Sequence, residues 1–100
     1  MAKKTASCTH RAHLFYLGRV QGIGFRYTAE GVAHRAGVVG FVKNLSDGRV
    51  EVVCEGSKEK IDSMLEEIMK GPLGRHIQKV DCFWEEPTGA FTDFTVEFHY

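Results

Sequence analysis

The sequence GRVQGIGFRY (residues 18–27) joins an apolar stretch to a segment with helical spacing. The residues before it, 12–17, are rich in β-forming side chains and predict a strand. Three glycines within seven residues, Gly18, Gly22 and Gly24, allow the backbone to adopt positive φ angles and to approach a ligand closely. The stretch therefore predicts a strand, a tight turn and a helix that follow one another directly.

This order of elements is typical of an anion-binding site. The first backbone N–H groups of a helix have no partner within the helix, and the helix dipole is positive at that end. A glycine-rich turn that leads into a helix aims these groups at one point. Arg26, in the first helical turn, adds a planar fork of donors that matches a phosphate. We therefore expect the stretch to bind a phosphoryl group.

The composition is that of an ordinary globular protein. The 100 residues are 43% hydrophobic and 26% charged, which favours a single domain with its own core. We expect residues 1–9 to form a flexible tail and residues 10–100 to form the domain. Thirteen basic and thirteen acidic side chains cancel at pH 7, and this neutrality argues against a dedicated nucleic-acid binder.

Cysteine usage and hydropathy indicate the expected compartment. Cys8, Cys54 and Cys82 are odd in number and include no C-x-x-C pair. Cys54 and Cys82 fall at inward positions of expected strands, where a thiol acts as a small apolar filler. The N-terminal residues contain no apolar segment of the signal-peptide kind, and the longest apolar run, 37–42, is too short to span a bilayer. A reduced, cytoplasmic protein without a membrane partner is expected.

Two helices and four further strands follow from the apolar pattern. A helix from Phe25 to Ala36 is expected to end at Gly37, and a second helix is expected to begin after Ser57 and to end at Gly71. Strands are expected at 38–44, 49–55 and 77–85, with a last strand that carries Phe94, Val96 and Phe98. The first two of these strands form a hairpin through Ser46-Asp47-Gly48, and 71–76 is a loop. In strand 77–85 the inward side chains are expected to be Val80, Cys82 and Trp84.

The element order β-α-β-β-α-β predicts an α+β, ferredoxin-like double split βαβ sandwich. It has an antiparallel sheet with both helices on one face, plus a terminal strand. In this topology the first and second strands run parallel and the third strand lies between them. The end of strand 38–44, at Asn44, is therefore expected at the same sheet edge as residues 21–26, where such folds commonly bind ligands.

The side chains expected at this edge are donors rather than nucleophiles. They are Arg26, Asn44 and the hairpin tip around Asp47 and Arg49, without a Ser-His-Asp, Cys-His or paired-carboxylate arrangement. The amide of Asn44 can accept a hydrogen bond from water and donate one to a phosphate. Because no strong base is nearby, the suitable substrate has a good leaving group and requires orientation above all. A mixed anhydride of a carboxylic acid and phosphate fits this description.

Two segments closely resemble the signatures of the acylphosphatase family. They are GRVQGIGFR (residues 18–26) and GFVKNLSDGRV (residues 40–50), with Gly56 at the expected distance, and the resemblance covers residues 11–100. Members of this family hydrolyse acyl phosphates to a carboxylate and inorganic phosphate without a metal or cofactor. The resemblance implies the same fold, a small acyl phosphate as substrate and inorganic phosphate as product. We also expect the protein to be a monomer.

The resemblance also implies roles for individual residues. Arg26 corresponds to the family's phosphate-binding arginine, and Asn44 corresponds to the asparagine that positions the attacking water. The expected phosphate cradle is the backbone of Gln21, Gly22, Ile23, Gly24 and Phe25. Tyr16 replaces a residue that is usually small and aliphatic, and Ile23 replaces a valine. Both replacements are apolar and remove no donor, so they bear on substrate fit and not on mechanism.

Other interpretations remain open from the residues alone. The same turn could hold a phosphate ligand without turnover, as a binding or regulatory module. RNA binding is disfavoured because Gly40-Phe41-Val42, a fragment of an RNA-recognition motif, lies on the wrong strand. His10 and His13 are three residues apart on a strand and so face opposite sides, which argues against a shared metal. The aromatic side chains near the C-terminus are expected to be core residues: Trp84, Phe91, Phe94 and Phe98.

Overall fold

The computed structural model describes residues 9–98. The elements in chain order are β1 (His10–Gly18), α1 (Phe25–Ala36), β2 (Val39–Asn44), β3 (Val50–Gly56), α2 (Lys58–Lys70), a short 3₁₀ helix (Gly74–His76), β4 (Ile77–Glu85) and β5 (Phe94–Glu97). Every expected helix and strand is present, and the 3₁₀ helix lies within the expected loop. The flexible tail was expected at residues 1–9, of which 1–8 lie outside the described residues.

Both helices begin and end at the residues that their capping signals indicate. Gly37 follows α1 with a φ of 81°, and its N–H donates to the carbonyl of Ala33 at 2.9 Å. The hydroxyl of Ser57 accepts a hydrogen bond from the N–H of Lys60 at the start of α2, at 3.2 Å. The apolar stripes face the sheet and are buried, with Phe25, Ala29, Val32 and Ala33 on α1 and Ile61, Met64 and Ile68 on α2.

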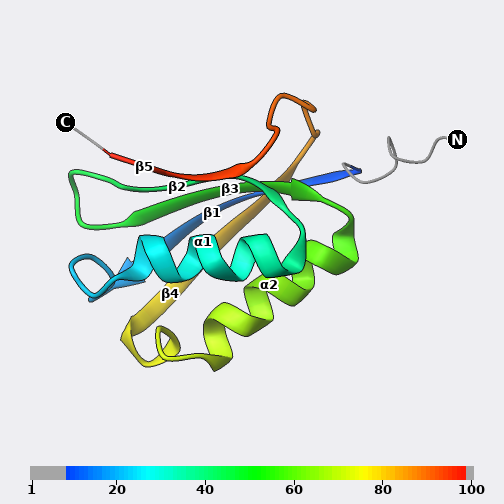
Figure 1. Cartoon of the computed structure of the whole chain (residues 1–100). Helices are drawn as coiled ribbons and strands as arrows, with labels where there is room; N and C mark the ends of the chain where they lie inside the picture. Colours follow the sequence, from blue (N-terminus) through cyan, green and yellow to red (C-terminus); the bar gives the residue numbers. More distant parts are fainter. Residues whose placement is uncertain (1–8, 99–100) are drawn as a thin grey trace, which may run out of the picture.

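The sheet has the strand order β4-β1-β3-β2-β5, and both helices cover one of its faces (Figure 1). Strands β1 and β2 both pair with β3 in antiparallel fashion, so β1 and β2 run parallel to each other as expected. Strand β5 pairs with β2 in parallel. The predicted antiparallel arrangement therefore holds for β1 to β4, and the fifth strand makes the sheet mixed.

The prediction that strand 77–85 contributes core side chains is wrong for two residues. Cys82 and Trp84 pair directly with Leu14 and Ala12 of β1, which are buried, so they face the helix side as expected. However, β4 is an edge strand, Cys82 is exposed, and Trp84 is 45% exposed. The orientation was correct, but the helices cover this edge of the sheet only in part: Ile77 and Val80 pack against the core, whereas Cys82 and Trp84 are exposed.

The expected aromatic cluster at the C-terminus also needs correction. Only Phe94 lies in the core, where it is fully buried. Phe98 is 55% exposed because it lies just beyond the end of β5. Phe91 is half-buried, and its ring centroid lies 6.0 Å from that of Phe41.

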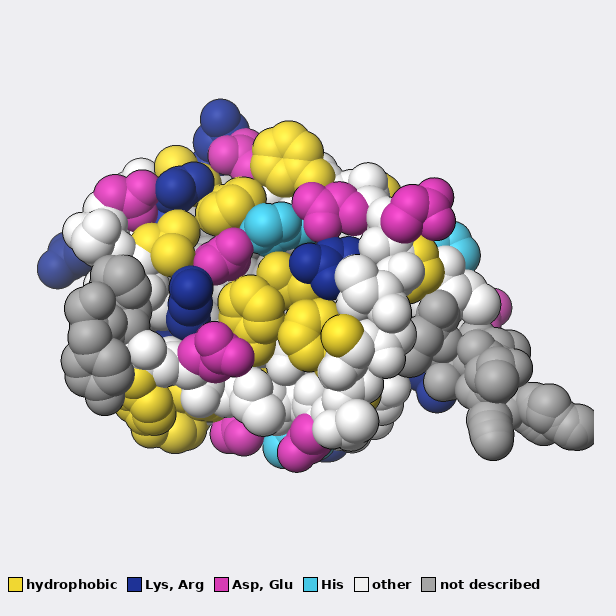
Figure 2. All heavy atoms as spheres, turned by 90° about the horizontal axis from the view of Figure 1, so that it is seen from above, with side chains coloured by type: hydrophobic (Ala, Val, Ile, Leu, Met, Phe, Trp, Pro, Cys, Tyr) yellow, Lys and Arg dark blue, Asp and Glu magenta, His cyan; other side chains and the backbone are white. Residues whose placement is uncertain are grey.

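The face of the sheet that the helices leave open carries an ion-pair network. Figure 2 shows this face, on which acidic, basic and histidine side chains lie between hydrophobic ones. His13 contacts Glu51 at 2.6 Å and Glu85 at 3.1 Å. Arg11 donates to Glu85 at 2.9 Å and to Glu55 at 3.0 Å. The network thus ties β1 to both of its neighbours, β3 and β4.

Glu55 is the one fully buried carboxylate among the described residues, and it anchors the connection between β4 and β5. It accepts hydrogen bonds from the N–H and the hydroxyl of Thr88, at 2.8 and 3.1 Å, and from the N–H of Gly89 at 3.0 Å. Burial alone would raise the pKa of Glu55, but the hydrogen bonds from Thr88, Arg11 and Gly89 hold its pKa below the usual value. The carboxylate therefore fixes the place where the chain enters β5.

The lowered pKa of Glu55 predicts a contribution to stability that is lost in acid. The unfolded chain binds a proton on this carboxyl near about pH 4.3, whereas the folded protein does so only at lower pH. The free energy of unfolding should therefore decrease as the pH falls through this range. In Glu55→Gln the protein should be less stable at neutral pH, but its stability should decrease less steeply in acid. Urea unfolding between about pH 5 and about pH 2 measures the difference.

Glu86→Gln is a matched control, because it removes an exposed carboxylate just after β4. Its acid transition should keep the steepness of the parent transition. An unchanged steepness in Glu55→Gln would contradict the role given to this carboxylate. Arg11 and Glu85 belong to the same ion-pair network as Glu55, and both remain in the variant.

Candidate active site

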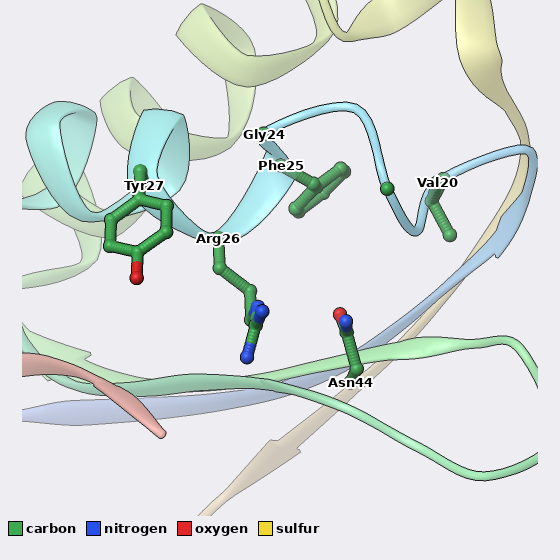
Figure 3. Close-up of a pocket in the computed structure, with 7 residues that line it drawn as sticks. Val20, Gly24, Phe25, Arg26, Tyr27 and Asn44 are labelled. Atoms are coloured by element: carbon green, nitrogen blue, oxygen red, sulfur yellow. The ribbon is translucent and has the colours of Figure 1, made fainter. Parts of the chain in front are cut away.

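A pocket lies between the β1–α1 turn, the N-terminus of α1 and the end of β2. It has a volume of about 120 Å³ and is lined by Val20, Gly22, Gly24, Phe25, Arg26, Tyr27 and Asn44. In Figure 3 the side chains of Arg26 and Asn44 extend into the same space, one from the helix and the other from the strand. The convergence expected from the topology, between residues 18 positions apart in the sequence, is thus present.

The backbone of the turn leaves hydrogen-bond donors at this pocket. Gly22 and Gly24 have φ angles of 80° and 82°, and a Cβ at either position would meet no atom within 4 Å. These glycines are therefore required by the backbone conformation and not by crowding. Within residues 9–98, no N–H group from Gln21 to Tyr27 donates to another protein atom; the first that does is that of Thr28. The pocket is lined by residues with free donors.

The N-terminus of α1 has no acceptor of its own. Gly24 is the N-cap residue and has no side chain, and the first helical turn contains no acidic residue. Most helices place a side-chain oxygen at this point, where it accepts hydrogen bonds from the first N–H groups. The positive end of the helix dipole is therefore uncompensated at the pocket, which favours a bound anion.

Arg26 is the second residue of α1, and the C-terminal segment holds its guanidinium group. Its Nη1 donates to the carbonyl oxygen of Glu97 at 3.2 Å. Its Cζ lies 4.7 Å from the centroid of the Phe98 ring. These contacts use one N–H and one face of the group, so further N–H donors remain for a ligand.

Asn44 is the last residue of β2, where it pairs with Val50 of β3. Its Oδ1 atom is buried and has no hydrogen-bond partner among residues 9–98. A buried polar atom without a partner is uncommon and costs about 1–3 kcal/mol. The carbonyl of this amide is therefore an acceptor that is ready for a donor from outside the protein, such as a water molecule.

The side chain of Gln21 joins the turn to the strand that carries Asn44. Its Nε2 donates to the carbonyl of Leu45 at 2.7 Å and to that of Arg49 at 2.9 Å. The β1–α1 turn and the β2–β3 turn are thus held together by two hydrogen bonds from one amide. The prediction for Gln21 concerned its backbone N–H, which these side-chain hydrogen bonds do not use; the residue itself does not line the pocket.

Comparisons with known proteins identify the family of this chain. A family model for acylphosphatase matches residues 12–96. The chain belongs to the acylphosphatase family. It is 44% identical over 86 residues to an acylphosphatase from Roseiflexus sp., an alignment that covers 86% of this chain and 92% of the relative. It is 46% identical over 87 residues to an acylphosphatase from Pyrobaculum arsenaticum, with 86% and 92% coverage.

Solved acylphosphatase structures have the same fold. The enzyme from Bacillus subtilis superimposes with a TM-score of 0.82 and 28% identity, and the match covers 89% of this chain and 99% of that one. The enzyme from Coxiella burnetii gives a TM-score of 0.82 and 31% identity, with 97% and 100% coverage. The protein is accordingly an acylphosphatase-type hydrolase.

The other residues that we expected at the acylphosphatase pocket are distributed differently. Ile23 is 37% exposed and does not line the pocket. Asp47 and Arg49 line a separate cavity, together with Leu17, Gly18, Arg19, Gly48 and Gln78. There the backbone N–H and the Nε of Arg49 donate hydrogen bonds to the carboxylate of Asp47, at 3.1 and 2.8 Å. These hydrogen bonds hold the pKa of Asp47 below its usual value.

Two lining residues, Val20 and Tyr27, lie within the stretch 18–27 but were not predicted individually as site residues. Tyr27 lies in the first turn of α1 beside Arg26, so the helix N-terminus argument could have included it. Among residues 9–98, no group of three His, Cys, Asp or Glu side chains is placed to hold a metal ion. Neither α1 nor α2 is long and apolar enough to cross a membrane, and the described part of the chain has no other α-helix.

Proposed function

We propose that the protein hydrolyses the anhydride bond between a carboxylic acid and phosphate, with defined roles for the pocket residues. In this proposal the N–H groups of the turn from Gln21 to Phe25 and the guanidinium of Arg26 hold the phosphoryl oxygens. Asn44 orients the attacking water. The observation that carries the proposal is the pocket in which the uncapped helix end, Arg26 and Asn44 meet.

The donor set is suited to the negative charge of a phosphoryl group. Backbone N–H groups and a guanidinium group stabilise charge most strongly when they are already in place before the reaction. The glycine turn and the helix fix the first set, and Glu97 and Phe98 hold Arg26. Electrostatic stabilisation of the transition state therefore requires little rearrangement of the protein.

Asn44 accounts for the orientation of the water molecule. Its Oδ1 can accept a hydrogen bond from the water, while its Nδ2 can donate to a phosphoryl oxygen. The oxygen of the water forms a bond to phosphorus as the bond between phosphorus and the acyl oxygen breaks. The electron pair of this bond leaves with the carboxylate, and a phosphate oxygen takes up the proton of the water. A carboxylate is a good leaving group, so no acidic side chain is required to protonate it.

An isotope experiment tests where the water attacks. Hydrolysis of benzoyl phosphate in ¹⁸O-labelled water should place the label in inorganic phosphate, because the pocket positions water against phosphorus. Mass spectrometry of the two products measures the distribution of the label. The uncatalysed reaction under the same conditions serves as the control. Label in the benzoate would mean attack at the carbonyl carbon, and the roles assigned to Arg26 and Asn44 would then be wrong.

A further inference from the structure

The C-terminal end of β5 contacts the pocket through Arg26, and the proposed hydrolysis does not by itself explain this contact. The guanidinium of Arg26 donates to the carbonyl of Glu97 at 3.2 Å and lies over the ring of Phe98, with its Cζ 4.7 Å from the ring centroid. Both contacts come from two consecutive residues more than 70 positions away in the sequence. Together they determine where the guanidinium group lies.

The register of the sheet explains why these two residues reach the pocket. Strand β5 pairs with β2 in parallel, and Glu97 lies opposite Lys43. One position further along, β2 reaches Asn44, and the segment after β5 reaches Phe98. The parallel pairing thus brings the end of β5 to the same edge of the sheet as Asn44. The segment enters β5 from the connection that Glu55 anchors.

Phe98 has no role in the hydrophobic core that would explain an aromatic residue at this position. Its side chain is 55% exposed, and it lies outside β5. A guanidinium group over an aromatic face is stabilised by the negative potential of the ring. An arginine side chain loses conformational entropy when a ligand orders it. A contact that orders the side chain before the ligand binds therefore lowers the entropic cost of binding.

We propose that Phe98 is a positioning residue, whose ring holds the guanidinium of Arg26 in the orientation that binds the phosphoryl group. The proposal rests on the phosphate-binding role proposed above for Arg26. Phe98 itself touches no reacting atom. Its effect should appear in phosphate affinity and should require an aromatic face, since an aliphatic side chain of similar size has no such face.

A series of variants at position 98 tests the proposal. Phe98→Ala and Phe98→Leu should raise the Ki of inorganic phosphate, and the KM for benzoyl phosphate, about two- to fivefold. Phe98→Tyr retains the aromatic face and should leave both constants close to the parent values. In the Arg26→Ala background, Phe98→Ala should have no further effect on Ki, because the two residues act as a unit. Phe83→Ala is the control, because Phe83 is similarly exposed at 53% but lies on β4.

A spectroscopic measurement on the free protein separates this proposal from the proposed function. The ring current of Phe98 should displace the NMR signals of the Arg26 side chain. This displacement should disappear in Phe98→Leu and persist in Phe98→Tyr. If the Ki of Arg26→Ala equalled that of the parent, the proposed function would fail even with the displacement present. If Phe98→Leu kept either the displacement or the parent Ki, the positioning role would be wrong.

Discussion

Arg26→Ala should raise the Ki of inorganic phosphate by about 10- to 100-fold, the largest effect on binding that we expect from one substitution. The variant deletes the proposed charge-assisted hydrogen bonds to a phosphate, while the backbone donors of the turn remain. The KM for benzoyl phosphate should rise in parallel, because substrate and product present the same phosphoryl oxygens to the pocket. Competitive inhibition of benzoyl phosphate hydrolysis by inorganic phosphate measures both constants.

Two further arginine variants make this test specific. Arg35→Ala removes the same charge from the last turn of α1, where Arg35 pairs with Glu67, and should leave Ki unchanged. Arg26→Lys keeps the charge but loses the planar fork, and its Ki should lie between those of the parent and Arg26→Ala. Equal Ki values for Arg26→Ala and Arg35→Ala would show that only net charge matters and would refute the assigned role.

Asn44→Ala should lower kcat by about 100-fold while the Ki of inorganic phosphate changes little. The variant loses the group proposed to orient the water but retains Arg26 and the backbone donors proposed to bind the phosphate. Its stability should not fall, since the substitution removes a buried Oδ1 that has no partner within residues 9–98. Steady-state kinetics on benzoyl phosphate and urea unfolding measure the two properties on the same preparations.

Lys43→Ala is the matched control for Asn44, because it changes the preceding residue on the same strand. The ammonium of Lys43 lies 5.9 Å from the ring centroid of Phe41, and adjacent residues of a strand face opposite sides of a sheet. Its kcat should equal the parent value. Hydrolysis by Asn44→Ala at the parent rate would show that another group orients the water. A large rise in Ki for this variant would instead assign Asn44 to phosphate binding.

The parts of the fold that local pattern determines were predictable from the sequence. The helix from Phe25 to Ala36 is recognisable because its apolar residues recur at helical spacing and a glycine, Gly37, marks its end. These elements limit the topology, and the topology predicts that Asn44 and Arg26 lie at the same edge of the sheet. Their position at one edge could be predicted because it depends only on the order and direction of the strands.

Features that depend on how neighbouring elements pack against a helix or strand could not be predicted from its local sequence pattern. Trp84 alternates correctly along β4, but alternation does not reveal that β4 is an edge strand that the helices leave partly uncovered. The hydrogen bonds of Gln21 and the contact of Phe98 with Arg26 arise between segments far apart in sequence. Each depends on the exact path of a turn or on the register of a strand, which residue type does not specify.

The glycine at the N-cap of α1 links the folding of the protein to the occupancy of its pocket. Because Gly24 supplies no oxygen, an anion bound as we propose would itself serve as the cap of the helix. A ligand that binds only the folded chain shifts the folding equilibrium by mass action, in proportion to the logarithm of its concentration above Kd. On the proposed binding, the concentration of inorganic phosphate would be one of the variables that set how much of this protein is folded.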